Sequence, residues 1–252
     1  MITGASSGIG RELARGLAAR GHGVTLVARS EDALNTLAGE LAGAHGVRAE
    51  VIACDLADPD ARDRLAAEIE RRGLEVEILA ANAGFGSYGA FVDADRQREL
   101  AQVRVNGEAV VDLAARYVPG MVRRRRGAVL ITGSVAGFQP LPGNATYSAI
   151  KAFEIGFAEA LHAELRPSGV TVTALCPGPV HSGFQKASGA EQYAESLPGP
   201  MWREAGEVAE AALRGLERGK RVVIPGAPNR IGALLGRLSP RPVVLRVMNT
   251  AD

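Results

Sequence analysis

The stretch Thr3-Gly4-Ala5-Ser6-Ser7-Gly8-Ile9-Gly10 decides how this chain folds. Glycine lets the backbone turn tightly and approach a ligand closely, and a segment of helical period follows directly. Because a helix N-terminus points free N–H groups outward, this arrangement predicts a phosphate-binding loop between a strand and a helix. The spacing is G-x-x-x-G-x-G rather than G-x-G-x-x-G, so an ordinary strand-to-helix turn without a ligand is the alternative.

Beyond this loop, short apolar runs rich in β-forming residues alternate with longer segments of helical period. The predicted strands are 24–28, 47–54, 76–81, 128–132, 170–176 and 221–224, and the predicted helices are 9–20, 31–44, 59–72, 95–122, 146–166 and 205–218. Such alternation is typical of parallel strands joined by helices. We therefore expect an α/β protein with a doubly wound, Rossmann-type, three-layer fold around a central parallel sheet, and a single domain over residues 1–252.

The strand that should precede the glycine-rich loop has little sequence from which to form. Only Met1 and Ile2 stand before Thr3. We therefore expect a truncated first strand. Either the chain begins late relative to its relatives, or upstream residues are absent from the sequence.

The charge composition gives no reason to expect nucleic acid. The net charge is +1 over 252 residues, whereas phosphate-binding proteins carry a clustered basic excess. The arginine run at 123–126 falls at the end of a predicted helix, where cations complement the helix dipole. Without a long apolar stretch or room for a signal peptide before Gly4, we expect no transmembrane segment and a cytoplasmic location.

Cysteine and histidine usage argues against disulfides and metals. Cys54 and Cys176 each end an apolar, strand-like run and are predicted to be buried in the core, and the four histidines lack metal-ligand spacing. We therefore predict no metal site and a reducing compartment.

Arg29 ends the second predicted strand, where an acidic residue would accept hydrogen bonds from the adenosine ribose in an NAD enzyme. A guanidinium can instead bind a 2′-phosphate through charge-assisted hydrogen bonds. NADP is therefore favoured over NAD, and a solvated arginine at a strand end is the alternative.

Tyr147 and Lys151 open a predicted helix, four residues apart. This spacing places the phenol and the ammonium on one helix face, one turn apart. A nearby cation stabilises the phenolate and lowers its pKa, so Tyr147 is a candidate for exchanging a proton.

The order of these segments resembles that of the short-chain dehydrogenase/reductase family. Residues 3–10 are similar to the family's TGxxxGxG, Asp55-Leu56 to its adenine-side acid, Asn82-Ala83-Gly84 to its NAG, residues 147–151 to its YxxxK and Pro177-Gly178 to its PG segment. The resemblance extends over the whole chain.

The resemblance implies a catalytic set of Asn106, Ser134, Tyr147 and Lys151. Ser134 would hold a substrate carbonyl, and Tyr147 would donate a proton as hydride arrives. Lys151 would also bind ribose hydroxyls, and Asn106 would hold a water in a proton relay behind the lysine.

The resemblance also implies where an NADP(H) cofactor would bind. The implied cofactor residues are Gly4, Ser6, Ser7, Gly8, Ile9, Gly10, Arg29, Asp55, Leu56, Asn82, Ala83, Gly84, Tyr147, Lys151, Pro177, Gly178, Val180 and Ser182. Two positions depart from the family pattern. Ser182 replaces the commoner threonine and keeps the hydroxyl, whereas Ala81 replaces the first asparagine of NNAG and removes one possible turn hydrogen bond.

These features together predict an NADP(H)-dependent oxidoreductase that moves a hydride between nicotinamide and a ketone or secondary alcohol. A non-catalytic NADP-binding regulator is one alternative. A serine hydrolase is another, because residues 148–151 fit S-x-x-K, but S-D-N and K-T-G are missing and the glycine before Ser134 does not fit G-x-S-x-G.

Substrate choice is expected to depend on residues 181–203, a predicted lid whose Phe184, Tyr193, Leu197 and Trp202 indicate an apolar or acyl-type substrate. The tail at 226–252 has the pattern of an amphipathic helix. It could pack against the body or a second subunit, cover the substrate pocket, or bind a membrane surface. The resemblance further implies a homodimer or homotetramer assembled through the helices near 95–122 and 146–166.

Overall fold

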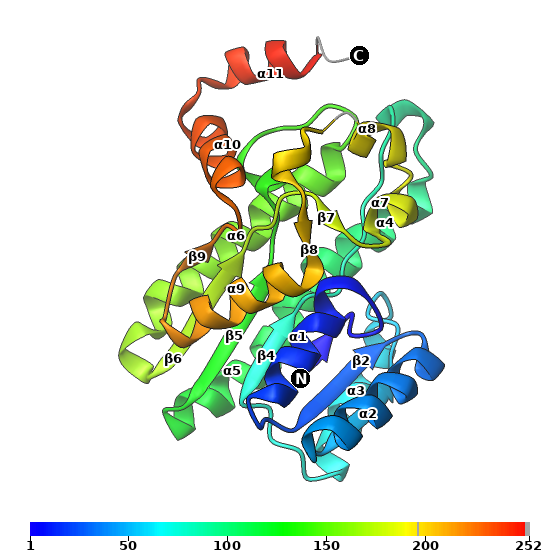
Figure 1. The fold of residues 1–252 in the computed structure, drawn as a ribbon, viewed down its shortest axis with the longest axis vertical. Coiled ribbons are helices and arrows are strands. Elements are labelled where there is room, and N and C mark those ends of the chain that lie inside the picture. The colour runs from blue at the N-terminus through cyan, green and yellow to red at the C-terminus, as the bar shows by residue number, and fades with distance from the viewer. Residues whose placement is uncertain (196, 250–252) are drawn as a thin grey trace.

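The computed structural model describes residues 1–195 and 197–249 and contains one seven-stranded, all-parallel sheet (Figure 1). The strand order is β3-β2-β1-β4-β5-β6-β9. The strands are β1 Ile2–Thr3, β2 Val24–Ala28, β3 Ala49–Ala53, β4 Ile78–Ala81, β5 Gly127–Thr132, β6 Val170–Leu175 and β9 Val222–Val223. The strand order reverses between β1 and β4, and in such sheets a crevice opens at the carboxyl ends of the strands at that point.

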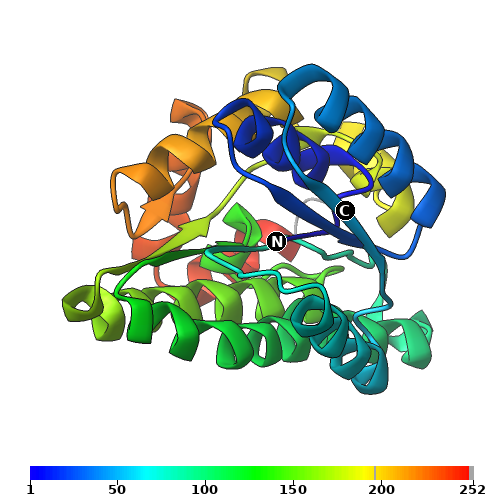
Figure 2. The same cartoon turned by 90° about the horizontal axis from the view of Figure 1, so that it is seen from below.

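Helices cover both faces of the sheet, as Figure 2 shows. One layer consists of α1 Gly8–Ala19, α2 Glu31–His45 and α9 Ala205–Glu217. The other consists of α3 Pro59–Arg71, α4 Arg96–Val103, α5 Ala109–Arg124 and α6 Ala145–Leu165. The predicted fold class, a parallel sheet between two layers of helices, is therefore confirmed.

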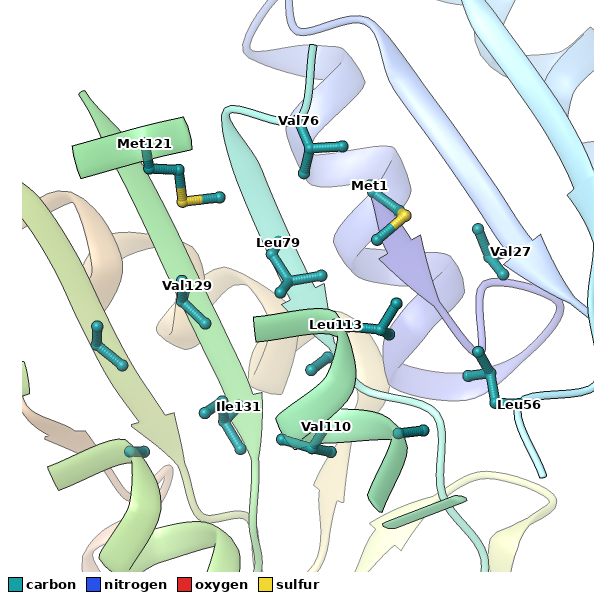
Figure 3. Close-up of a cluster of buried hydrophobic side chains, with 14 of the residues drawn as sticks. Met1, Val27, Leu56, Val76, Leu79, Val110, Leu113, Met121, Val129 and Ile131 are labelled. Atoms are coloured by element: carbon teal, nitrogen blue, oxygen red, sulfur yellow. The ribbon is translucent and has the colours of Figure 1, made fainter. Parts of the chain in front are cut away.

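The core consists of two apolar clusters, one on each face of the sheet. Val129 and Ile131 of β5 join the cluster drawn in Figure 3, whereas Leu130 between them joins the cluster under α1 and α9. Successive residues of a strand point to opposite faces, so a strand covered by helices on both sides must be apolar throughout. This is why these strands appear in the sequence as continuous apolar runs.

The first strand is as short as predicted, with only Ile2 and Thr3. It nevertheless lies at the centre of the sheet, where Ile2 is fully buried and pairs with Leu26 on one side and Ala80 on the other. The glycine-rich loop therefore leaves the middle of the sheet.

The long helix predicted over 95–122 is divided in the structure. The π-helical turn η2, Arg104–Glu108, separates α4 from α5 and has Asn106 and Gly107 buried. Asn106 uses both polar atoms of its side chain to bind the backbone of Phe85. The π-helical turn therefore coincides with hydrogen bonds to a residue outside the helix. Helical periodicity does not reveal such a contact.

The arginine run and the two cysteines lie as predicted. Arg123 and Arg124 are in the last turn of α5, and Arg124 and Arg126 pair with Glu75 and Glu77.

Both cysteines are buried free thiols, and burial raises the pKa of Cys54 to about 11 and that of Cys176 to about 12. They are therefore inert core side chains.

The predicted lid begins and ends at a small two-stranded parallel sheet, β7 Val180–His181 and β8 Arg203–Glu204. Between these strands lie α7 Phe184–Ser188, α8 Glu191–Glu195 and the short 3-10 helix η5 Gly199–Met201. The side chain of Tyr193, one of the predicted lid residues, lies outside the described residues.

The tail forms two helices, α10 Ala227–Leu238 and α11 Arg241–Asn249. α10 packs against the 3-10 helix η3 Val135–Phe138, while Ile231, Leu234 and Leu238 are more than half exposed. In the part of the chain that the structure describes, no helix is both long enough and apolar enough to cross a membrane.

Candidate active site

A cleft of about 1040 Å³ opens at the carboxyl ends of the central strands. It is lined by residues from the loops after β1, β2, β3, β4, β5 and β6, and by residues of α6, the 181–203 segment and the tail. Of the residues predicted from sequence to form the site, all but Gly10 and Asn106 line this cleft.

The glycine-rich loop forms the floor of one end of the cleft. Gly4 and Gly8 have φ of 67° and 51°, a left-handed backbone conformation that favours glycine. α1 begins at Gly8, so its free N–H groups face the space beside Ser6 and Ser7. The loop therefore fits a phosphate group, and its glycines leave room for one.

Gly10 has a packing role rather than a place in the lining. A Cβ atom at this position would lie 2.2 Å from the carbonyl oxygen of Gly4 and 2.6 Å from Nδ2 of Asn82. The missing side chain lets α1 lie directly against the loop and the end of β4.

Thr3 and Asn82 connect the ends of three central strands. The Oγ1 of Thr3 accepts hydrogen bonds from the backbone N–H groups of Asn82 and Ala83, both at 2.9 Å. The side chain of Asn82 donates to the carbonyl of Thr3 at 3.1 Å and accepts from Thr132 Oγ1 at 3.2 Å. Sequence reasoning missed Thr3 and Thr132, although a hydroxyl residue at the last position of an apolar strand was a visible signal.

Arg29, Asp55 and Leu56 line the cleft beside the glycine-rich loop, where β2 and β3 end. Arg29 is exposed at this rim, and Asp55 accepts a hydrogen bond from the backbone of Ala57 at 3.0 Å. A cation and an acid therefore lie at the same end of the cleft, about where the sequence predicts the adenosine.

Ser134, Tyr147 and Lys151 meet at the middle of the cleft. Ser134 follows β5, and its Oγ donates to the carbonyl of Pro177 at 3.4 Å and accepts from Ala136 N at 3.1 Å. Tyr147 and Lys151 lie on the same face of α6, with the ammonium 5.6 Å from the centre of the tyrosine ring. The helical spacing predicted this juxtaposition.

Lys151 is buried, and its ammonium has two partners besides Tyr147. The Nζ atom donates to the carbonyl oxygen of Thr132 at 2.8 Å and to Oε1 of Glu154 at 3.1 Å. Glu154 was not among the predicted site residues. Its signal was a charged residue three positions after Lys151, on the same side of a helix whose neighbouring residues are apolar.

Four effects act on the phenol of Tyr147, and together they raise its pKa above 10. Burial raises the pKa most, the charge of Lys151 and a hydrogen bond with Ser134 lower it, and Glu154 raises it. The charge of Lys151 therefore offsets part of the rise in the Tyr147 pKa that burial causes, and the charge of Glu154 reduces that offset.

Asn106 lies next to the cleft but is not part of its lining. Its Oδ1 accepts from the backbone N–H of Phe85 at 3.2 Å, and its Nδ2 donates to the carbonyl of Phe85 at 2.9 Å. Asn106 therefore holds the backbone just after Gly84, whereas the predicted water relay would require it to act toward Lys151.

Residues 177–180 and Ser182 form a wall of the cleft that meets the glycine-rich loop at Gly8. Ser182 accepts a hydrogen bond from the N–H of Phe184 at 3.3 Å, and a Cβ atom at Gly8 would lie 3.4 Å from Ser182 Cβ. Gly178 is packed against the buried side chain of Asn229 so closely that an added Cβ would lie 2.3 Å from Asn229 Oδ1. The tail thus supports this wall.

The far end of the cleft is mostly apolar. Phe184 packs against Tyr147 with ring centres 5.6 Å apart. The other side chains at this end come from the loop before α6, the 181–203 segment and the tail, and include Leu141, Leu197, Met201, Ala233, Leu235, Val243 and Val244. Most were missed from sequence, because segments so far apart in the chain meet only in the folded protein.

A model of the short chain dehydrogenase family matches residues 1–193. This chain belongs to the short-chain dehydrogenase/reductase family. Members of this family are oxidoreductases that act on CH–OH or C=O groups with a nicotinamide cofactor.

Individual members of the family are similar over most of the chain. A very-long-chain 3-oxoacyl-CoA reductase of Anas platyrhynchos is 36% identical over 193 residues, which are 75% of this chain and 61% of that protein, so this chain spans less than two thirds of that relative. A short-chain dehydrogenase from Sphingobium yanoikuyae, solved in complex with NADPH, is 34% identical with a TM-score of 0.84, and the match covers 100% of this chain and 94% of that one. A bulky-bulky ketone specific alcohol dehydrogenase from Comamonas testosteroni is 30% identical with a TM-score of 0.79, over 100% and 93% of the two chains.

The cleft of this short-chain dehydrogenase/reductase fits a nicotinamide dinucleotide. It offers a helix N-terminus with side-chain-free glycines for the phosphates, a cation and an acid at one end, and Tyr147 and Lys151 at the middle.

Proposed function

We propose that this protein is an NADP(H)-dependent ketoreductase that transfers a hydride between nicotinamide and a ketone or secondary alcohol. One observation carries the proposal: Ser134, Tyr147 and Lys151 converge on a cleft that begins at the glycine-rich N-terminus of α1. A non-catalytic regulator has no need of these three side chains together.

In the proposed reduction, the protein positions the carbonyl and supplies a proton. Ser134 turns its hydroxyl from the carbonyl of Pro177 to the substrate oxygen, and Tyr147 donates its phenolic proton to the same oxygen. Lys151 stabilises the resulting phenolate and binds ribose hydroxyls. The bound nicotinamide supplies the hydride, and the fixed dipoles of the site stabilise the charge that develops on the substrate oxygen.

The cofactor contacts follow from the lining of the cleft. The phosphates bind the loop from Gly4 to Ile9 at the N-terminus of α1, Asp55 and Leu56 hold the adenine side, and residues 82–84 line a ribose. Val180 and Ser182 hold the carboxamide end. Gly10 acts indirectly, through the packing of α1 against the loop.

NADP(H) is the proposed cofactor because of Arg29. Its guanidinium is exposed at the rim where the adenosine ribose would lie, and a guanidinium pairs with a phosphate in two-point, charge-assisted geometry. The relative from Sphingobium yanoikuyae was solved with NADPH, which supports this choice.

The proposed substrate is a bulky apolar or acyl-type ketone. The substrate end is walled by Phe184, Leu197, Met201 and Leu235, and the names of the relatives refer to 3-oxoacyl and bulky ketone substrates. The 181–203 segment acts in this proposal as the lid and, with the tail, forms the apolar wall.

Two further expectations remain proposals. Asn106 takes part in a proton relay behind Lys151, in addition to holding Phe85. The protein is a cytoplasmic homodimer or homotetramer assembled through α4, α5 and α6, and the exposed side chains of Leu100, Val103, Val111 and Phe153 on these helices support such an assembly.

A carbonyl screen tests the proposed function. Aliphatic, aromatic, steroidal and acyl-thioester ketones are each incubated with the protein and NADPH, and loss of NADPH absorbance is followed. We expect turnover with bulky apolar or 3-oxoacyl compounds. Tight NADPH binding without oxidation in every case would favour the regulator, and hydrolysis of an activated ester without NADPH would favour a hydrolase.

A further inference from the structure

Glu154 is a buried carboxyl group that the proposed chemistry leaves unused. It lies on α6, one turn beyond Lys151, and is only 1% exposed. Carboxylates are almost never fully buried without a partner or a function. The partner of Glu154 is the lysine that serves the proposed proton donor.

The contacts of Glu154 lie around a single ammonium group. Lys151 Nζ is 2.8 Å from Oε2 and 3.1 Å from Oε1 of Glu154, and only the contact to Oε1 has hydrogen-bond geometry. Among the described residues, Oε2 has no hydrogen-bond donor. The carboxyl group is therefore held by the lysine alone.

Few other titratable groups interact with Glu154. They are Tyr147 and Lys151 on the same helix and Cys176 just after β6. The charge of Glu154 raises the pKa of all three. β5 contributes only the carbonyl of Thr132, which accepts from Lys151 Nζ. Glu154 thus acts electrically on the catalytic pair and on one inert thiol.

A carboxylate at this distance cancels much of the charge of the lysine. Interactions between charges are strong in a buried site because little water screens them. When Glu154 is ionised, Tyr147 is next to a nearly neutral pair, and when Glu154 is protonated, it is next to an uncompensated cation. A cation stabilises the phenolate, so the second state makes Tyr147 the stronger acid.

We propose that Glu154 is a positioning residue that sets the acid strength of Tyr147 through Lys151. It holds the ammonium against the Thr132 carbonyl and fixes how much positive charge the phenol experiences. The catalytic meaning of this inference rests on the proposed function, whereas the coupling between Glu154 and Tyr147 does not.

The protonation of Glu154 changes in the neutral range, because burial raises its pKa to about 7 even though Lys151 lowers it. The environment of Tyr147 should therefore respond to pH between 6 and 8, well below the range in which the phenol itself ionises.

NMR of tyrosine labelled with 13C at Cζ tests the coupling without any need for activity. The chain has four tyrosines, and Tyr147→Phe assigns the Tyr147 signal. Wild type, Glu154→Gln and Glu159→Gln are titrated from pH 6 to 11. Glu159 is a matched control, since it lies on the same helix but pairs with Arg221.

We expect the Tyr147 pKa to be lower by about one unit in Glu154→Gln, because a negative charge has been removed from its lysine. Glu159→Gln should match wild type. The Tyr147 signal of the wild type should also shift between pH 6 and 8, and Glu154→Gln should lack this shift. Equal Tyr147 titrations in wild type and Glu154→Gln would overturn the proposal.

Two arrangements keep the test decisive if Glu154→Gln does not fold. Glu154→Asp keeps the negative charge but moves it away from Lys151, because the side chain is one methylene shorter. It should lower the Tyr147 pKa by less than the glutamine variant would. The shift between pH 6 and 8 needs only wild-type protein, and its absence would show that Glu154 keeps one protonation state in that range. A Tyr147 pKa in Glu154→Asp equal to that of wild type would overturn the proposal.

Rates separate this inference from the proposed function. If wild type reduces a ketone, the alkaline limb of the kcat/KM profile should move to lower pH by about one unit in Glu154→Gln and stay in place in Glu159→Gln. An active wild type with superimposable profiles would contradict the role of Glu154 only. An inactive wild type with the expected NMR shifts would contradict the ketoreductase only.

Discussion

Tyr147 and Lys151 lie four residues apart, but their surroundings, more than their spacing, determine what the pair can do. The spacing predicted that both side chains share a helix face, and the structure places the ammonium 5.6 Å from the ring centre. The i, i+3 spacing of Lys151 and Glu154 is a visible signal for their contact, but it could not predict that the lysine also donates to the Thr132 carbonyl. That contact depends on the packing of α6 against β5, which no local pattern records.

Replacing Tyr147 by Phe should reduce turnover at least a hundredfold, because a positioned acid contributes that much or more. NADPH should still bind, as measured by the change in its fluorescence. Tyr117→Phe is a suitable control, since the buried Tyr117 hydroxyl has no hydrogen-bond partner among the described residues and does not line the cleft. If Tyr147→Phe retained more than about a tenth of the wild-type rate, Tyr147 could not be the proton donor.

Replacing Arg29 by Ala should weaken NADPH binding by about tenfold to a hundredfold, the usual effect of losing hydrogen bonds between charged groups. NADH binding should change little. Titration of both cofactors by fluorescence measures the two effects, with Arg64→Ala, an exposed arginine on α3, as control. A parallel loss for NADH and NADPH would mean that Arg29 does not recognise the 2′-phosphate.

The sequence predicted most of the helices and strands but not how they are divided or joined. Strands buried on both faces leave continuous apolar runs, and the helices between them leave a clear period, so both were placed to within a few residues. The π-helical turn η2 was not predicted, because it coincides with the hydrogen bonds between Asn106 and Phe85. The tail pattern predicted a helix but not its contact with η3.

Replacing Gly10 by Ala should disturb the contact between α1 and the glycine-rich loop. The new methyl group would overlap the Gly4 carbonyl oxygen, and overpacking commonly costs about 1–3 kcal/mol or more. Urea unfolding should show this loss, together with weaker NADPH binding. Gly39→Ala, in the middle of α2 with open space around it, should instead stabilise the protein by about 0.5–1 kcal/mol. Equal effects of the two substitutions would contradict the packing role of Gly10.

The buried carboxyl group of Glu154 makes the stability of the folded protein depend on pH. Its pKa is about 7 in the folded protein, compared with an ordinary value of 4.5. Between these values the folded state retains a proton that the unfolded state releases, so stability falls as pH rises through this window.

Relative to Glu154→Gln, the wild type should therefore lose on the order of 3 kcal/mol of unfolding free energy between pH 4.5 and pH 7. Urea unfolding of both proteins across this range measures the difference, and the groups that the two share cancel. A constant difference between the two proteins over that range would show that Glu154 does not change its protonation there.

The two ends of the cleft draw on different parts of the chain. The end beside the glycine-rich loop is lined almost entirely by residues before 183, whereas much of the apolar end is lined by residues between 184 and 244, which include side chains of α10 and α11. If the protein is the proposed ketoreductase, substitutions between 184 and 244 can therefore change its substrate while the residues proposed for hydride transfer stay in place. We expect a chimera that carries the last 70 or so residues of a relative, about the length of a few helices and their loops, to show the ketone specificity of that relative. Its preference between NADP(H) and NAD(H) should remain that of this protein.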